Sequence, residues 1–282
     1  MRIVILTALA MAAFAANSVL ARLAIGSGTI DALGYTGVRL AAGAALLVVL
    51  LLVTRRTRGS LTISGSWAGA GALLGYALAF SIAYLMLGAG PGALILFASV
   101  QMSMLGWAVL KGDRPGALEW VGIAVAIASL AYLVSPGLAA PNPVGTLLMM
   151  ASGAAWAGYS LIGRGSTSPL ADTAGNFIRC LPVAIALMAI GLATAPPAPA
   201  GVIYAILSGA VASGVGYAIW YLALPHLSRI TASTVQLTVP AIAAFGGVVL
   251  LAEPITLRLA IASLGILGGV ALALFVSDRR GR

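Results

Sequence analysis

The sequence contains very few charged residues. Of its 282 residues, 7% are charged and 61% are apolar, whereas a soluble globular protein carries roughly 25% charged residues. So few polar side chains could not cover a surface that faces water, which excludes an ordinary soluble fold. Lipid can replace water around such a surface, so the composition indicates an integral membrane protein.

Cysteine and histidine are almost absent. Cys180 is the only cysteine and His226 the only histidine, which excludes an intrachain disulfide and a Cys/His metal cluster. We therefore expect no metal and no cofactor. The formal charge of +9 comes from basic residues that stand singly or at the ends of apolar runs. We expect them to set the orientation in the membrane and not to bind nucleic acid.

What the sequence has in abundance is long apolar runs. A helical span needs about 20 mostly apolar residues. Ten runs are of about this length, at residues 3–22, 32–53, 66–87, 91–110, 117–134, 143–163, 172–194, 200–221, 230–251 and 256–276. Short connections rich in Gly and Pro separate them. The runs lack the alternation of polar and apolar residues that a transmembrane barrel needs.

A nine-residue pattern occurs twice. FAANSVLAR at residues 14–22 and WAGYSLIGR at residues 156–164 both run from an aromatic residue to an arginine. Arg39 and Arg179, 140 positions apart, also match. The first pattern resembles the end of a cleavable signal peptide, but its internal counterpart leads us to expect that it is retained.

The similarity extends over both halves of the chain. Residues 88–113 align without gaps to residues 228–253, and each stretch ends in an acidic residue. Spans 1–5 therefore resemble spans 6–10. Because five is odd, the halves have opposite orientations, as in many secondary transporters. We expect an all-α integral membrane protein with ten transmembrane helices, arranged as inverted five-helix repeats, residues 1–137 and 138–282, around a central cavity.

Basic residues are unevenly distributed between the two sides. If the first span starts in the cytoplasm, two arginines, Arg22 and Arg258, lie outside. Eleven basic residues then lie inside: Arg2, Arg55, Arg56, Arg58, Lys111, Arg114, Arg164, Arg229, Arg279, Arg280 and Arg282. This bias predicts that both termini are cytoplasmic.

These features resemble the drug/metabolite transporter superfamily, in the branch with two EamA domains. The resemblance is carried by the five-plus-five spans, by AWAGYS at 155–160, and by VP at 239–240 followed by LAEPIT at 251–256. The first half departs from the pattern, because Val100 stands in place of the proline and KGDRP at 111–115 in place of the Glu motif. The aromatic content is also similar to that of the YddG-like exporters of aromatic amino acids.

The resemblance implies a bacterial inner-membrane exporter. It also implies that spans 3, 4, 8 and 9, with 1 and 6, surround a central cavity, whereas spans 5 and 10 lie at the periphery.

Aromatic and small polar residues recur at helical spacing in four of these spans, which predicts a cavity lining for an apolar or aromatic side chain. The candidates are Phe14, Asn17, Ser18, Tyr76, Phe80, Tyr84, Trp156, Tyr159, Ser160, Tyr217, Trp220 and Tyr221. The alternative is that they only pack helices together or form interface belts, as expected of Trp67 and Trp120 near span ends.

Spans 4 and 9 add polar candidates. An amide in hydrocarbon is costly without a partner, so Gln101 and Gln236 should face the interior. With Ser99 and Thr234 they could bind a substrate carboxylate or ammonium, or bridge helices. Pro240 interrupts the backbone hydrogen bonds of its span, which creates a hinge or a static kink.

Two arginines lie inside apolar runs. Arg39 and Arg179 could bond to helix carbonyls or pair with Asp31 and Asp172, which precede them by about two helical turns. We favour a structural role over attraction of an anion at the entrance.

Every Asp and Glu lies at the edge of a span or outside the spans, whereas proton-coupled carriers usually need a carboxylate deep inside a span. We therefore expect export of amino acids (aromatic or otherwise apolar) and related small metabolites by alternating access, uncoupled to protons. The alternatives are a drug/proton antiporter and a flippase for a lipid-linked metabolite. No GxSG or HExxH motif supports an enzyme. The expected partners are a small-molecule substrate and membrane lipid, and pairs of glycines such as Gly265 and Gly269 allow a monomer or a weak homodimer.

Overall fold

A computed structural model describes residues 2–58, 63–112, 116–135, 140–163, 165–227 and 235–280. Within these residues every regular element is a helix. The first half contains α1 (Arg2–Ala21), the π-helical η1 (Arg22–Gly26), α2 (Ala32–Arg58), α3 (Trp67–Ala83), α4 (Ala89–Leu110) and α5 (Ala117–Val134). The second half contains α6 (Pro143–Gly163), α7 (Pro169–Thr194), α8 (Pro199–Ile206), the π-helical η2 (Leu207–Val215), α9 (Gly216–Ala223), the 3₁₀ turn η3 (Leu224–His226), α11 (Thr238–Leu251) and α12 (Leu257–Arg280).

The helices correspond to the ten expected spans. Elements α8, η2 and α9 follow one another without a break and together form the eighth span. Among the described residues, five stretches are long and apolar enough to cross a membrane: Arg2–Gly26, Ala32–Val53, Ala89–Trp107, Pro169–Thr194 and Pro199–Ala223. Shorter apolar helices occupy the third, fifth, ninth and tenth spans. The all-α membrane fold is thus confirmed.

Local sequence marks where several helices begin. Pro143, Pro169 and Pro199 occupy the first position of α6, α7 and α8, where a proline leaves no hydrogen bond unmade. The side chain of Ser66 accepts a hydrogen bond of 2.9 Å from the backbone N–H of Gly69 and so caps α3.

The ninth span is interrupted near Pro240. Helix α11 begins only at Thr238, so Pro240 lies in its first turn, and Leu237 forms a turn between residues 235–236 and α11. Proline has no N–H to bond to the carbonyl of residue 236, which explains the break at this point. A hinge function at Pro240 stays a prediction.

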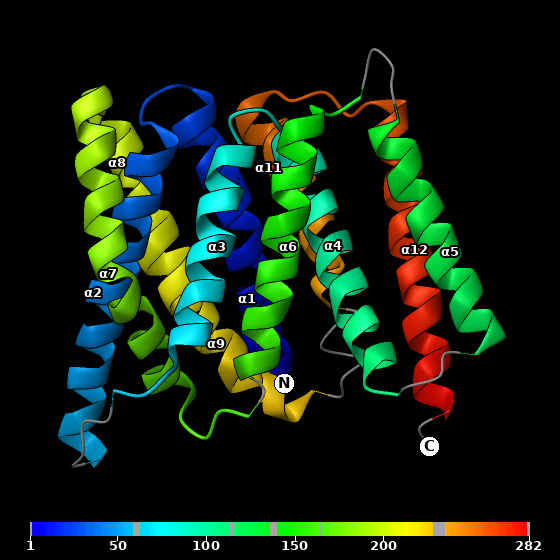
Figure 1. Ribbon diagram of the computed structural model, residues 1–282, viewed down its shortest axis with the longest axis horizontal. Helices are drawn as coiled ribbons and strands as arrows, with labels where there is room; N and C mark the ends of the chain where they lie inside the picture. The colour runs from blue at the N-terminus through cyan, green and yellow to red at the C-terminus, as the bar shows by residue number, and fades with distance from the viewer. Residues whose placement is uncertain are drawn as a thin grey trace.

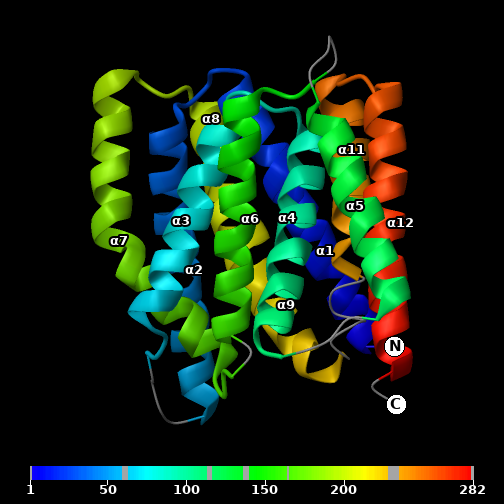
Figure 2. The same cartoon turned by 45° about the vertical axis from the view of Figure 1, so that its right-hand side comes forward.

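The two halves run in opposite directions. Helix α1 ends near Arg22, which bonds to the carbonyl of Tyr84 just after α3. Helix α6 begins on this same side, because a Cβ on Gly145 would lie 2.9 Å from Met86 Cβ. Figures 1 and 2 show α1 and α6 antiparallel and both chain ends on the opposite face.

Helix contacts also repeat between the halves. The pairs α2–α7, α5–α12 and α4–α11 each join equivalent helices. The pair α3–α6 has its counterpart in α1–α9, and α4–α6 in α1–α11. Helices α5 and α12 pack against each other at one end of the molecule (Figure 1), so the center lies between the other helices of both halves.

Close backbone approach joins α5 to α12. A Cβ on Gly122 would lie 2.5 Å from the carbonyl oxygen of Gly269, and a Cβ on Gly269 would lie 2.6 Å from that of Gly122. Gly269 therefore serves packing within the bundle. The outer surface carries large exposed side chains such as Leu264 and Phe245, together with Trp67 and Trp120 near helix ends. Such an apolar surface suits contact with lipid.

Candidate functional site

Aromatic rings from both halves fill the center of the molecule. We call this group the aromatic cluster: Phe14, Tyr76, Phe80, Tyr84, Trp156, Tyr159, Phe177, Tyr217, Trp220 and Tyr221. Trp156 on α6 is its hub, since its ring centroid lies 4.9 Å from that of Tyr76 on α3 and 4.7 Å from that of Tyr217 on α9. Phe14 on α1 joins it at 5.7 Å. These contacts bring together four helices that are far apart in the sequence.

A small cavity lies inside the cluster. Its volume is about 10 Å³, near the minimum that one water molecule needs. Its lining residues are Phe14, Asn17, Tyr76, Phe80, Leu96, Phe97, Trp156 and Tyr217. This space among the rings is too small for a substrate, and a substrate-sized space there would require the rings to move.

Arg39 of α2 lies directly behind this lining. Its side chain is fully buried at 1% exposure. The Nε group donates to Ser213 Oγ at 3.2 Å, and Nη2 donates to the hydroxyls of Tyr76 at 3.0 Å and Tyr217 at 3.2 Å. The guanidinium carbon also lies 4.9 Å from the centroid of the Phe80 ring. Three neutral hydroxyls and an aromatic face thus surround this cation.

The π-helical segment η2 positions these partners. A Cβ on Gly209 of η2 would lie only 2.0 Å from the carbonyl oxygen of Arg39, so a glycine is required for α2 to approach so closely. The segment also directs Ser208 and Ser213 toward Asn17 of α1, whose Oδ1 accepts hydrogen bonds of 2.7 and 3.2 Å from them. Departures from α-helical geometry of this kind are frequent at functional sites.

Neither alternative for Arg39, a helix carbonyl or Asp31, is among its hydrogen-bond partners Ser213, Tyr76 and Tyr217. Asp31 Oδ1 instead accepts hydrogen bonds from the backbone N–H groups of Leu33 and Gly34, at 2.9 and 3.0 Å. It therefore caps the first turn of α2, where a carboxylate is stabilised by the free N–H groups.

Of the two alternatives for Arg179, helix carbonyls or Asp172, the structure shows the first. Asp172 accepts hydrogen bonds from Ser64, Ser166 and the backbone N–H of Gly65. Arg179 donates to the carbonyl oxygens of Ser64 at 2.7 Å and Gly175 at 2.9 Å. The alternative of a bond to helix carbonyls thus holds for Arg179.

Donor groups remain unused around the cavity. Arg39 Nη1 and Trp156 Nε1 are buried and have no hydrogen-bond partner. Among the described residues, the only buried acidic side chain is Glu119, which caps peripheral α5 through the backbone N–H of Gly116. The center therefore carries a positive charge with no carboxylate beside it.

The other predicted residues lie around this center or apart from it. The rings of Tyr84, Tyr159, Trp220 and Tyr221 belong to the cluster without lining the cavity. The structure buries Ser18, Ser99, Gln101, Ser160 and Gln236 but places none of them in the lining. Ser99 Oγ donates to the carbonyl of Ile95 in its own helix. Thr234 lies outside the described residues.

Sequence reasoning missed three apolar residues of the center. Leu96 and Phe97 on α4 line the cavity, and the ring centroid of Phe177 on α7 lies 6.2 Å from that of Tyr217. The structural role favoured for Arg39 stays a prediction, with which its hydrogen bonds to Ser213, Tyr76 and Tyr217 are compatible. An arginine within an apolar run is also a signal of function.

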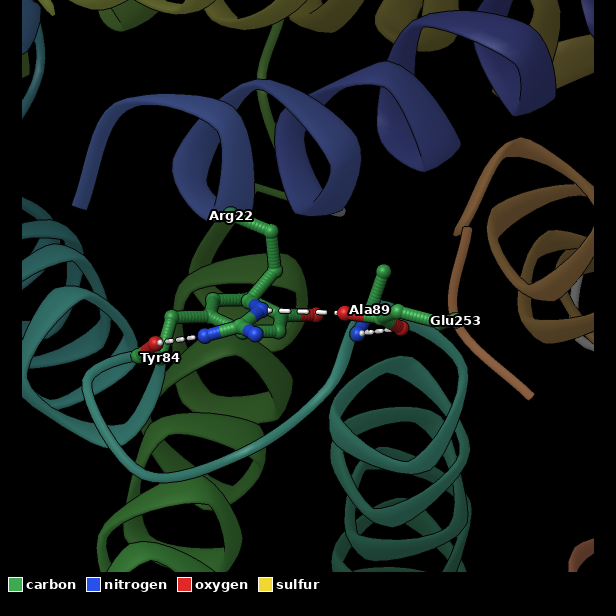
Figure 3. Close-up of polar contacts among 4 residues, drawn as sticks. All are labelled: Arg22, Tyr84, Ala89 and Glu253. Carbon is green, nitrogen blue, oxygen red and sulfur yellow. Dashed lines mark hydrogen bonds and ion pairs between the residues drawn. The ribbon is translucent and has the colours of Figure 1, made fainter. Parts of the chain in front are cut away.

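A polar network lies at the face of the bundle opposite the chain ends. Arg22 Nε forms an ion pair of 3.1 Å with Glu253 Oε1, and Arg22 Nη1 donates to the carbonyl oxygen of Tyr84 at 3.1 Å. Glu253 Oε2 accepts a 2.7 Å hydrogen bond from the backbone N–H of Ala89 (Figure 3). Ala252 has the left-handed φ of 52° that ends α11 just before Glu253. The network connects η1, the α3–α4 connection and the segment after α11.

Comparison with known proteins relates this arrangement to transporters. Residues 143–275 match the EamA-like transporter family. An uncharacterised protein of Pseudomonas aeruginosa is 48% identical over 100% of this chain and 96% of its own length. The uncharacterised inner membrane transporter YedA of Escherichia coli is 34% identical over 96 residues, which are 34% of this chain and 31% of YedA.

A solved crystal structure has the same fold. It superposes with a TM-score of 0.66 and 20% sequence identity, over 97% of this chain and 97% of that chain. At this identity the likeness concerns the fold alone. The helical membrane architecture and the sequence match lead to one conclusion: the chain belongs to the EamA-like transporter family of the drug/metabolite transporter superfamily, as a multi-pass membrane protein.

Proposed function

We propose that this transporter exports amino acids with aromatic or other apolar side chains, and related small metabolites, by alternating access. The aromatic cluster between helices of both halves is the observation that carries the proposal. Rings such as those of Phe14 and Trp156 offer a broad apolar contact, while Tyr76 and Tyr217 add hydroxyls at the same cavity. A lining of this kind suits an apolar body that carries a few polar groups.

Alternating access requires that the two faces of the bundle open in turn. The ion pair between Arg22 and Glu253 joins the end of the first span to the end of the ninth, and so ties one half to the other on one face. This network supports a state closed on that face. Breaking it and rocking the halves would open the center to that side, which we take to be the outside with both termini cytoplasmic.

We further propose that transport is not coupled to protons. No acidic residue belongs to the described lining of the cavity, and a buried carboxylate is the group that usually exchanges a proton in such carriers. The gradient of the solute itself then drives its export. We propose that the monomer is the transporting unit, because residues of one chain complete the cluster, and that a homodimer, if formed, is weak.

Uptake into proteoliposomes tests this function. We would measure labelled tryptophan, methionine, threonine and a cationic dye, each with and without a pH gradient. Saturable flux of the apolar amino acids that ignores the gradient is the expected result. Dye transport that needs the gradient would instead identify a drug/proton antiporter and would contradict the proposal.

A further inference from the structure

We propose that Arg39 binds the carboxylate of the transported solute, so that the substrates are organic anions or zwitterions with an apolar body. The inference rests on the proposed function in one respect: it takes the cavity in the aromatic cluster as the substrate site. It adds the chemical group that the protein recognises and the residue that recognises it.

The first argument concerns charge. A guanidinium stays ionised inside a protein, and a buried cation is stabilised mainly by a partner of opposite charge. Arg39 has none among the described residues, since its hydrogen-bond partners are the hydroxyls of Ser213, Tyr76 and Tyr217. An anionic ligand would supply the missing charge.

The second argument concerns hydrogen bonds. A guanidinium has five N–H donors in a planar fork that matches a carboxylate. Arg39 uses Nε and Nη2, whereas Nη1 is buried without a partner. The indole Nε1 of Trp156, a ring that lines the cavity, is also a buried donor without an acceptor. A carboxylate is an acceptor only and would satisfy such groups.

The third argument concerns position. Tyr76 and Phe80 contact Arg39 on one side and line the cavity on the other. Tyr217 does the same, and its hydroxyl donates to that of Tyr76 at 3.3 Å. These three side chains therefore stand between the guanidinium and the cavity, and a solute in an enlarged cavity would reach Arg39 once they rotate aside. Their rings would remain as walls for its apolar part.

A binding measurement tests the proposal directly. The probes are 3-phenylpropionate and 3-phenylpropionamide, which have the same shape but differ in charge. Purified protein in nanodiscs reports binding through the change in its tryptophan fluorescence, to which Trp156 and Trp220 of the cluster contribute, because the phenyl probes do not fluoresce at tryptophan wavelengths. We expect the acid to bind at least about tenfold more tightly than the amide, as a charge-assisted hydrogen bond implies.

Variants at two equivalent arginines then locate the preference. Arg39→Gln should remove the preference for the acid, and Arg39→Lys should keep it with weaker affinity. Arg179→Gln, at the equivalent position of the second repeat, should keep the full preference. If Arg39→Gln does not fold, two measurements still test the proposal. They are the affinity of Arg39→Lys for the acid and the ratio of acid to amide affinity in the unaltered protein.

Three results would overturn the proposal: equal affinity for acid and amide, no binding of the acid at millimolar concentration, or an unchanged preference in Arg39→Gln. The outcome is separable from that of the transport assay. Preferred binding of the acid without amino acid flux would refute the proposed substrates and leave Arg39 as an anion site. Amino acid flux with equal affinity for acid and amide would support the proposed function and refute the role of Arg39.

Discussion

Arg39 and Arg179 occupy equivalent positions in the two repeats but have different surroundings. Arg39 is buried among the hydroxyls of Ser213, Tyr76 and Tyr217. Arg179 is partly buried and bonds to backbone carbonyls near the start of its own helix, with its guanidinium 5.8 Å from the exposed ring of Trp67. One cation bonds to residues that line the cavity, and the other bonds to backbone carbonyls.

The difference shows how a repeat becomes asymmetric. Backbone carbonyls are permanent partners, so Arg179 gains nothing from a ligand. The tyrosine hydroxyls beside Arg39 can turn to other partners when their rings rotate, so Arg39 can gain a hydrogen bond from a ligand. A mid-membrane arginine costs ~2.5–3.5 kcal/mol on insertion scales, and this cost is offset in different ways at the two positions.

The largest expected effect is the contrast between the two arginines in transport. Arg39→Gln should lower the flux of apolar amino acids by about 10- to 150-fold, the loss expected for a charge-assisted hydrogen bond. Arg179→Gln should lower thermal stability, while flux per folded protein stays close to that of the unaltered chain. Flux into proteoliposomes, normalised to monodisperse protein, measures both. Equal losses of flux in the two variants would show that Arg39 and Arg179 do not differ in their roles.

A smaller effect is expected from the hub of the aromatic cluster. Trp156→Ala should reduce flux about tenfold, because Trp156 contacts Phe14, Tyr76 and Tyr217 at the cavity. Trp67→Ala removes a tryptophan that is 73% exposed and should leave flux unchanged. Kinetic comparison of the two variants is the measurement. Normal flux in folded Trp156→Ala protein would remove the cluster from the substrate site.

A substitution at Gly209 would displace α2 while leaving the Arg39 side chain itself unaltered, and so tests whether the position of Arg39 matters. Gly209→Ala places a methyl group 2.0 Å from the carbonyl oxygen of Arg39, and such overpacking costs about 1–3 kcal/mol. We expect a lower melting temperature and a several-fold loss of flux. Gly158→Ala is the matched control, because no atom lies within 4 Å of its added Cβ. If both substitutions behave alike, the approach of α2 to η2 does not matter for transport.

The smallest effect on stability is expected at the ion pair between Arg22 and Glu253. Both side chains are partly exposed, at 23% and 18%, so Arg22→Gln should change stability by no more than about 1 kcal/mol. It should nevertheless increase quenching of cluster tryptophans by acrylamide, since one face opens more often. Glu253→Gln should act alike, and the double variant should add little. If the effects of the two single variants on quenching add up in the double variant, Arg22 and Glu253 do not act together in closing this face.

Several particular features could be predicted from the sequence. The apolar runs predicted the helices because a span in lipid must satisfy its backbone hydrogen bonds within itself. The odd number of spans in each repeat predicted the antiparallel arrangement of α1 and α6. Helical spacing predicted that Tyr76 and Phe80 share a face, since residues four apart meet on one side of a helix.

Other features depended on contacts between distant segments. The sequence did not reveal the π-helical turns of η2, because i-to-i+5 bonding there depends on packing against α1 and α2. It also left two alternatives for Arg39 and Arg179, helix carbonyls or a nearby Asp. The structure shows that Arg179 bonds to carbonyls, whereas Arg39 takes hydroxyl partners that neither alternative named. Leu96 and Phe97 carried no signal that separated them from other apolar residues of their span.

By itself, the sequence determined that the protein lies in a membrane, that it is built of helices, and that aromatic residues concentrate on a few of them. These properties follow from the amino-acid composition and from the helical spacing of residues, both of which can be read from short stretches of the chain. Only the tertiary structure decided which arginine reaches the center and which carboxylate pairs with Arg22. Such partners are chosen by packing of helices more than 150 residues apart, as for Arg39 with Ser213 and Tyr217, and no local pattern encodes that choice.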